Sequence, residues 1–187
     1  MALKRGKKLI NSIATEYDGI SFKSRLEVNC YKALKEADIV LVTGGLGYIG
    51  SHTSVELLAQ GYEVVIADNL SNTRAEVLDG IEAIAGTRPE WLQVDLSDSA
   101  ACRLALEGLH FDGIIHFAAF KAVGESTQQP LAYYKNNLGS LLVLLEFMQE
   151  KGIQNIVFSS SCTVYGQPDV LPVTEATPRK DAESPYG

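Results

Sequence analysis

Residues 39–69 read IVLVTGGLGYIGSHTSVELLAQGYEVVIADN, and this stretch decides the fold. The apolar run over residues 39–42 predicts a buried strand, and a glycine-rich turn follows it. Next come an amphipathic helix that ends near Gly61 and a second apolar strand that closes on Asp68. Strand, helix and strand in this order predict a βαβ unit, in which the two strands run parallel.

Three glycines occupy the turn between the first strand and the helix. Gly44, Gly47 and Gly50 have the spacing GxxGxxG, a variant of the dinucleotide-binding fingerprint. Glycines in such a turn allow a sharp change of direction, a close approach of the backbone to a pyrophosphate and close packing of the helix on the sheet. The amide groups at the helix N-terminus donate hydrogen bonds to the anion. The turn therefore predicts a dinucleotide site.

An acidic residue, Asp68, closes the second strand. In the fingerprint, a carboxylate at about this distance from the glycines accepts hydrogen bonds from the ribose hydroxyls of the adenosine. The same carboxylate repels a 2'-phosphate, so we expect NAD to bind in preference to NADP. The alternative is that Asp68 only starts the turn that follows it.

Strand and helix patterns alternate through the rest of the chain. We expect strands at 91–94, from Gly113 and from Asn155, with helices around 99–109 and 131–151. This order predicts an α/β fold with a doubly wound, mostly parallel sheet of the Rossmann type, whose ligand crevice lies at the carboxyl ends of the strands. We expect His116 to be a buried strand residue and not a catalytic one. The residues expected at these strand ends are Asp95, Phe117, Ala118, Ala119 and Ser161.

The composition is that of an ordinary globular protein, with 187 residues of which 46% are apolar and 21% charged. Three cysteines without a CxxC spacing indicate neither a disulfide framework nor a zinc site. We therefore expect no metal and a reducing, cytoplasmic compartment. No apolar run approaches the length of a membrane span, and the first residues lack the apolar segment of a secretory signal, so we expect no membrane association.

Residues 1–37 differ from the rest in charge. They carry eight Lys or Arg and four Asp or Glu, whereas the whole chain has a net charge of −7. Ser24 and Glu27 have the spacing of a capping box, and apolar residues recur on one helical face after them, which predicts a short amphipathic helix. We expect two domains, a basic arm at 1–37 and an NAD-binding domain at 38–187. Clustered cations attract nucleic acid, but a solvated tail is the commoner role, so we expect no nucleic-acid partner.

Five ordered motifs resemble those of a known family. VTGGLGYIGSH (42–52), DNLSN (68–72), HFAAFKAVGES (116–126), YYKNN (133–137) and FSSSCTVYG (158–166) are similar to the successive motifs of the UDP-glucose 4-epimerases, within the extended short-chain dehydrogenase/reductases. The resemblance runs from about residue 39 to residue 187. It implies NAD as the cofactor and an isomerase reaction of galactose metabolism, which interconverts UDP-galactose and UDP-glucose through a 4-keto intermediate. It also makes a homodimer one candidate oligomeric state.

The resemblance also implies roles for individual residues. Ser161 and Tyr186, the latter as the tyrosine of a YxxxK motif, would be catalytic. The related sugar-nucleotide dehydratases carry acidic residues where Thr163 and Val164 stand here, so the resemblance favours epimerisation over dehydration. The implied cofactor contacts are Gly44, Gly47, Tyr48, Ile49, Gly50, Asp68, Asn72, Asp95, Leu96, Phe117, Ala118, Ala119, Phe120, Lys121 and Asn136.

The sequence reaches Gly187, one residue after the tyrosine of this motif. It includes neither the lysine of YxxxK nor the part that binds the uridine nucleotide in the family. We therefore expect this chain by itself to be inactive as an epimerase and to bind a UDP-hexose weakly or not at all. A second interpretation stays open, in which the chain is a non-enzymatic NAD-binding or nucleic-acid-associated fusion protein and the basic arm carries its function.

Overall fold

The computed structural model describes residues 15–17, 20–22, 38–174 and 176–187. In the N-terminal part, β1 (Thr15–Tyr17) and β2 (Ile20–Phe22) pair antiparallel, with Thr15 opposite Phe22. The amphipathic helix predicted after Ser24 lies outside the described residues. All the other described elements belong to residues 38–187.

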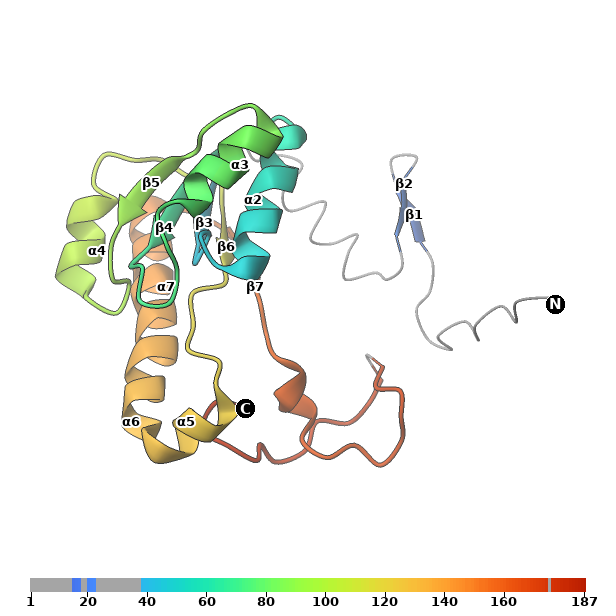
Figure 1. The fold of residues 1–187 in the computed structure, drawn as a ribbon. Coiled ribbons are helices and arrows are strands. Elements are labelled where there is room, and N and C mark those ends of the chain that lie inside the picture. Colours follow the sequence, from blue (N-terminus) through green and yellow to red (C-terminus); the bar gives the residue numbers. More distant parts are fainter. Residues whose placement is uncertain (1–14, 18–19, 23–37, 175) are drawn as a thin grey trace.

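A five-stranded parallel sheet forms the centre of residues 38–187 (Figure 1). Its strands stand in the order β5-β4-β3-β6-β7, which is the Rossmann order and confirms the predicted fold class. After β3 the chain adds β4 and β5 on one side and then returns to add β6 and β7 on the other, so a crevice is expected between β3 and β6, where the strand order reverses. The strands are β3 (Ile39–Thr43), β4 (Glu63–Asp68), β5 (Glu90–Gln93), β6 (Gly113–His116) and β7 (Asn155–Phe158).

Helices cover both faces of this sheet (Figure 1). α2 (Tyr48–Ala59) and α3 (Val77–Ala85) pack on one face, and α4 (Ser99–Ala105) and α7 (Gly139–Lys151) on the other. Past the carboxyl edge, the chain forms the short elements α5 (Val123–Gln128), α6 (Pro130–Tyr133), the π-helical turn η1 (Tyr134–Leu138) and the 3-10 helix η2 (Cys162–Tyr165).

The alternation of side chains along β3 creates two apolar cores. Val40 and Val42 face α2 and α3, where they pack in a cluster with Leu57 of α2. Leu41 points the other way and packs in a second cluster with Leu144 of α7. Because both faces of β3 are buried, its sequence is apolar throughout, as in the strands of parallel sheets generally.

Several helix boundaries differ from the sequence-based expectation. The helix expected at 131–151 consists of α6, η1 and α7, with a π-helical turn in the middle. The helix expected to reach Leu109 ends at Ala105, before Gly108 takes a φ of +77°. Neither α3 nor α5 was predicted from the sequence pattern. No helix in the described part of the chain is long and apolar enough to cross a bilayer.

Candidate functional site

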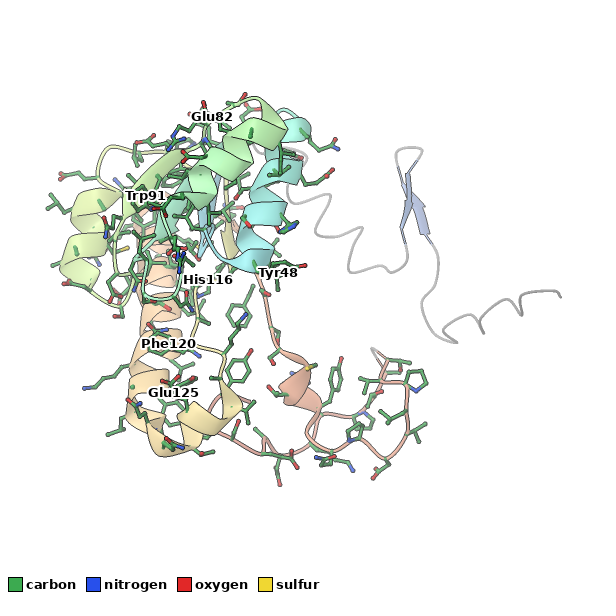
Figure 2. The ribbon with its side chains drawn as sticks, in the orientation of Figure 1. Tyr48, Glu82, Trp91, His116, Phe120 and Glu125 are labelled. Carbon is green, nitrogen blue, oxygen red and sulfur yellow. The ribbon has the colours of Figure 1, made fainter. Side chains whose placement is uncertain are left out.

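Three adjoining cavities lie at the carboxyl edge of the sheet. The Asp95 cavity has a volume of about 50 Å³, the glycine-turn cavity about 170 Å³, and the serine cavity, lined by residues 159–161, about 390 Å³. Ala118 and Ala119 line all three, so the cavities form one continuous crevice. In Figure 2, the labelled Tyr48, His116 and Phe120 mark this edge of the sheet.

The glycine turn leaves no room for a side chain at Gly44 or at Gly50. Gly44 has a φ of +67°, and a Cβ added there would lie 2.8 Å from the backbone nitrogen of Ala118. A Cβ on Gly50 would lie 2.2 Å from the carbonyl oxygen of Gly44. Both positions therefore require glycine. The turn leads directly into α2, whose first residues Tyr48 and Ile49 line the glycine-turn cavity. The N-terminus of α2 thus faces a cavity, where it favours an anionic group.

The Asp68 carboxylate shapes the turn and faces the crevice. It is 6% exposed, and its Oδ2 accepts a hydrogen bond from the backbone amide of Leu46 at 3.1 Å. Its Oδ1 accepts hydrogen bonds from the Leu70 amide at 3.0 Å and from the Thr73 hydroxyl at 2.7 Å. A carboxylate offers about four acceptor positions, so these contacts leave one on Oδ2. Since Asp68 lines two of the cavities, that acceptor is available to a ligand.

The segment after β6 forms the floor of the crevice, and side chains from η1 hold it. The Phe120 amide donates to Oδ1 of Asn137 at 2.8 Å, and Nδ2 of Asn137 donates to the Phe120 carbonyl at 2.9 Å. Asn136, which lines the Asp95 cavity, donates to the same Oδ1 at 2.8 Å. The exposed Lys121 follows and lines the glycine-turn cavity.

His116 lies beneath the serine cavity, at the end of β6. It is only 2% exposed, which confirms its predicted burial, and burial lowers its pKa to about 4. The ring is therefore neutral near pH 7, with Nδ1 2.7 Å from the Thr43 hydroxyl. It stacks on Phe158 with ring centroids 5.8 Å apart. Its environment favours a neutral structural role over proton transfer at neutral pH.

The two predicted catalytic residues line the serine cavity together. Ser161 precedes η2, and its Oγ accepts hydrogen bonds from the amide and the hydroxyl of Thr163, at 3.2 Å and 2.9 Å. Both acceptor positions of the serine are used, which leaves its own hydrogen to be donated to a ligand. A Cβ added to Gly187 would lie 3.3 Å from the Thr163 carbonyl oxygen, so the segment that carries Tyr186 lies against η2.

A second tyrosine of the serine cavity, Tyr133, is buried and fully paired. Its hydroxyl donates to Oε2 of Glu125 at 2.7 Å and accepts from the Ala122 amide at 3.1 Å. Burial and the hydrogen bond to the Glu125 carboxylate raise the pKa of Tyr133. It therefore stays neutral and acts as a hydrogen-bond donor. Glu125 is labelled in Figure 2, on α5.

Every predicted site residue lines at least one of the three cavities, although these residues come from separate segments of the chain. Other residues that line the cavities were not predicted from the sequence. Thr73 lies outside the five motifs and had no recognisable signal, whereas Asn137 stands beside the predicted contact Asn136 in the YYKNN motif. Among the described residues, no group of three His, Cys, Asp or Glu side chains is placed to hold a metal ion.

Comparison with known proteins gives one family and a consistent set of relatives. The model of the family described as GDP-mannose 4,6 dehydratase matches residues 41–187. The UDP-glucose 4-epimerase of Bacillus subtilis is 50% identical over 148 residues, which cover 79% of this chain and 43% of that protein. The enzyme of Schizosaccharomyces pombe with the same name is 49% identical over 152 residues, covering 79% and 42%.

Solved structures agree with these relatives. A UDP-glucose 4-epimerase from Bifidobacterium longum, in complex with NAD+ and UDP, superposes with a TM-score of 0.76 and 45% identity, covering 79% of this chain and 44% of that one. An epimerase from Stenotrophomonas maltophila, with bound NAD and formylated UDP-arabinopyranose, gives a TM-score of 0.74 and 47% identity, with the same coverage. The chain spans less than half the length of these relatives.

Proposed function

We propose a function from one premise: this chain belongs to the family described as GDP-mannose 4,6 dehydratase. Within it, we assign the chain to the NAD-binding portion of a UDP-glucose 4-epimerase, an enzyme that interconverts UDP-galactose and UDP-glucose through a 4-keto sugar. The observation that carries this proposal is the single crevice that all the predicted site residues line. The identity of about 50% to epimerases supports it.

The crevice has the features that a dinucleotide requires. The turn at Gly44 and Gly50, with no space for a Cβ, would bring backbone amides and the N-terminus of α2 to the pyrophosphate. The remaining acceptor on Asp68 would take a ribose hydroxyl, while Asp95 and Leu96 line the small cavity beside it. When bound, NAD would supply hydride transfer to and from C4 of the sugar.

Ser161 and Tyr186 would handle the proton of the sugar 4-hydroxyl. Both line the serine cavity, the largest of the three and the one with room for a hexose. Tyr186 also lines the glycine-turn cavity, so this residue lies where the two cavities adjoin. We assign Tyr186 as the group that removes and returns the proton, and Ser161 as the hydroxyl that donates a hydrogen bond to the same oxygen.

Epimerisation fits this site better than dehydration, which the family description names. Dehydration of a sugar needs a further acid and base, and the dehydratases carry acidic residues after this strand. Here Thr163 takes that place, and its hydroxyl donates to Ser161 at 2.9 Å. This hydroxyl therefore holds the serine in place. A threonine side chain has no carboxyl group, so it cannot serve as the acid or base that the removal of water needs.

The chain matches less than half of each relative, and this affects the activity expected of the chain alone. Because the chain spans about 43% of their length, we propose that residues 1–187 alone bind the cofactor without turning over a UDP-hexose. We further propose a division into a basic arm at 1–37 and the NAD-binding domain at 38–187, a cytoplasmic location and a homodimeric complete enzyme. No membrane or nucleic-acid partner is part of this account.

The test is a coupled assay for the conversion of UDP-galactose into UDP-glucose. It compares residues 1–187 alone with the same chain joined at Gly187 to the remaining portion of the Bacillus subtilis relative, which supplies the missing length. Only the joined protein should show turnover, and Tyr186→Phe or Ser161→Ala should lower it by about 100-fold or more. Tyr165→Phe, which changes a tyrosine of η2 outside the three cavities, is the matched control and should have no effect. A joined protein that folds but shows no conversion, or whose activity survives Tyr186→Phe, would contradict the assignment.

A further inference from the structure

One side chain holds the floor of the crevice with two hydrogen bonds. Asn137 and Phe120 are far apart in sequence, yet the amide group of Asn137 pairs with both the N–H and the C=O of Phe120, at 2.8 Å and 2.9 Å. This is the pair of bonds that a neighbouring strand would supply to an extended residue. The side chain therefore substitutes for a strand where the sheet has ended and the segment after β6 continues alone.

The π-helical turn η1 places this side chain. Such turns are rare and frequently lie at functional sites. Here the turn lets two consecutive residues reach the crevice, with Asn136 at the Asp95 cavity and Asn137 at the serine cavity. Nδ2 of Asn136 donates to Oδ1 of Asn137, the oxygen that also accepts the Phe120 amide. With both acceptor positions of Oδ1 filled, the orientation of the Asn137 amide group is fixed.

A second contact holds the same segment two residues further on. The Ala122 amide donates to the hydroxyl of Tyr133 at 3.1 Å, and the rings of Tyr133 and Phe120 lie 5.5 Å apart. Lys121 stands between these two fixed positions and lines the glycine-turn cavity. The backbone on both sides of Lys121 is thus held by side chains that precede α7.

We propose that Asn137 is a positioning residue for the dinucleotide: by holding the Phe120 backbone, it fixes the segment from Ala118 to Lys121 in the shape that lines all three cavities. The inference rests on the proposed function, because it names the residue that prepares the crevice for that cofactor. Asn137 would affect the dinucleotide indirectly, by holding this segment in place. Its removal should weaken NAD+ binding without unfolding the domain.

Calorimetric titration of the 187-residue chain with NAD+ tests this inference. Asn137→Ala should weaken binding by about tenfold or more, since both bonds to Phe120 are lost. Hydrogen exchange of the Phe120 amide should become faster in the same variant. The matched control is Asn155→Ala, which removes another asparagine side chain bound to a backbone carbonyl, that of Asp112, at the opposite edge of the sheet. This control should bind NAD+ as the unchanged chain does, whatever its effect on thermal stability.

The variant Asn137→Asp adds a readout that general destabilisation would not produce. At neutral pH, the introduced carboxylate can accept from the Phe120 amide but cannot donate to the Phe120 carbonyl, so binding should be weak. At pH 5 and below, a growing fraction of the carboxyl is protonated and can again donate and accept. The affinity relative to the unchanged chain at the same pH should therefore recover as the pH falls.

The outcomes separate this inference from the function on which it rests. Binding of NAD+ by the unchanged chain, with equal affinity in Asn137→Ala, would overturn the positioning role and leave the proposed function standing. An unchanged chain that folds and binds no NAD+ would overturn both. Equal weakening in Asn137→Ala and Asn155→Ala, with no recovery of Asn137→Asp at low pH, would show a general loss of stability and also overturn the positioning role.

Discussion

The Asp68 carboxylate accepts a hydrogen bond from the backbone amide of Leu46, at 3.1 Å, and so ties the end of β4 to the glycine turn after β3. One buried carboxylate therefore links the ends of two adjacent strands. The same carboxylate accepts from Leu70 and Thr73, which fixes the turn that follows β4. Asp68 thus has two roles, since it shapes both turns and presents its remaining acceptor to the crevice.

Asp68 should decide the choice between NAD and NADP. The unchanged chain should bind NAD+ at least tenfold more tightly than NADP+, because the carboxylate repels a 2'-phosphate. Asp68→Asn should reduce the ratio of NAD+ affinity to NADP+ affinity, because it removes the negative charge. It should also lower the free energy of unfolding by about 1–3 kcal/mol, since an amide nitrogen facing the Leu46 amide would leave a buried donor unpaired. The two affinities are measured by calorimetry, and the free energy by urea unfolding. Asp79→Asn, at an exposed carboxylate of α3, is the control. A chain that prefers NADP+ would show that Asp68 does not lie at the ribose.

The glycine turn should be intolerant of one methyl group. In Gly50→Ala, the added Cβ would lie 2.2 Å from the Gly44 carbonyl oxygen, so the backbone must move. We expect a loss of about 1–3 kcal/mol in the free energy of unfolding and a clear loss of NAD+ affinity. Gly80→Ala is the matched control, because nothing lies within 4 Å of a Cβ there and the residue is inside α3. This control should gain about 0.5–1 kcal/mol and bind NAD+ normally. Equal behaviour of the two variants would contradict the geometry of the turn.

His116 should make the protein less stable in acid. Burial lowers its pKa to about 4, below the ordinary value of 6.5, so the unfolded chain takes up a proton in this window while the folded chain does not. The free energy of unfolding should therefore fall as the pH drops from 6.5 to 4, by up to about 1.4 kcal/mol per pH unit from this residue alone. Urea unfolding at pH 7, 6 and 5 measures the free energy of unfolding of the unchanged chain and of His116→Asn. The difference between the two proteins should change steadily over this range, and parallel curves would refute the role of His116.

Removal of residues 1–37 should leave NAD+ affinity within about twofold, because β3 and the glycine turn begin after them. Calorimetry of residues 38–187 beside the whole chain provides the comparison. If the whole chain binds nucleic acid at all, that binding should disappear with the arm and weaken steeply with added salt. Nucleic-acid binding that the shortened chain retains at high salt would show that the acidic remainder carries it by another mechanism.

Local sequence patterns predict the sheet well, because the strands are short, mostly apolar runs, and glycine follows β3 while an acidic residue closes β4. They do not predict the break between α6 and α7, since a π-helical turn inserts a single residue and leaves the apolar pattern of the helix almost unchanged. The contact of Asn137 with Phe120 joins two segments through a side chain, and no periodicity reports such a contact. The neighbouring placement of Ser161 and Tyr186 followed only from a resemblance, because the serine cavity forms in three dimensions from distant segments.

NAD is expected to bind in the crevice at the carboxyl edge of the sheet. Titration of the isotope-labelled chain with NAD+, followed by the backbone amide signals in two-dimensional NMR spectra, tests it most directly. We expect saturable shifts of the glycine-turn amides from Gly44 to Gly50 and of the segment from Phe117 to Lys121, with one NAD+ bound per chain. A folded chain whose spectrum does not change, or whose saturable shifts lie only outside the three cavities, would contradict it.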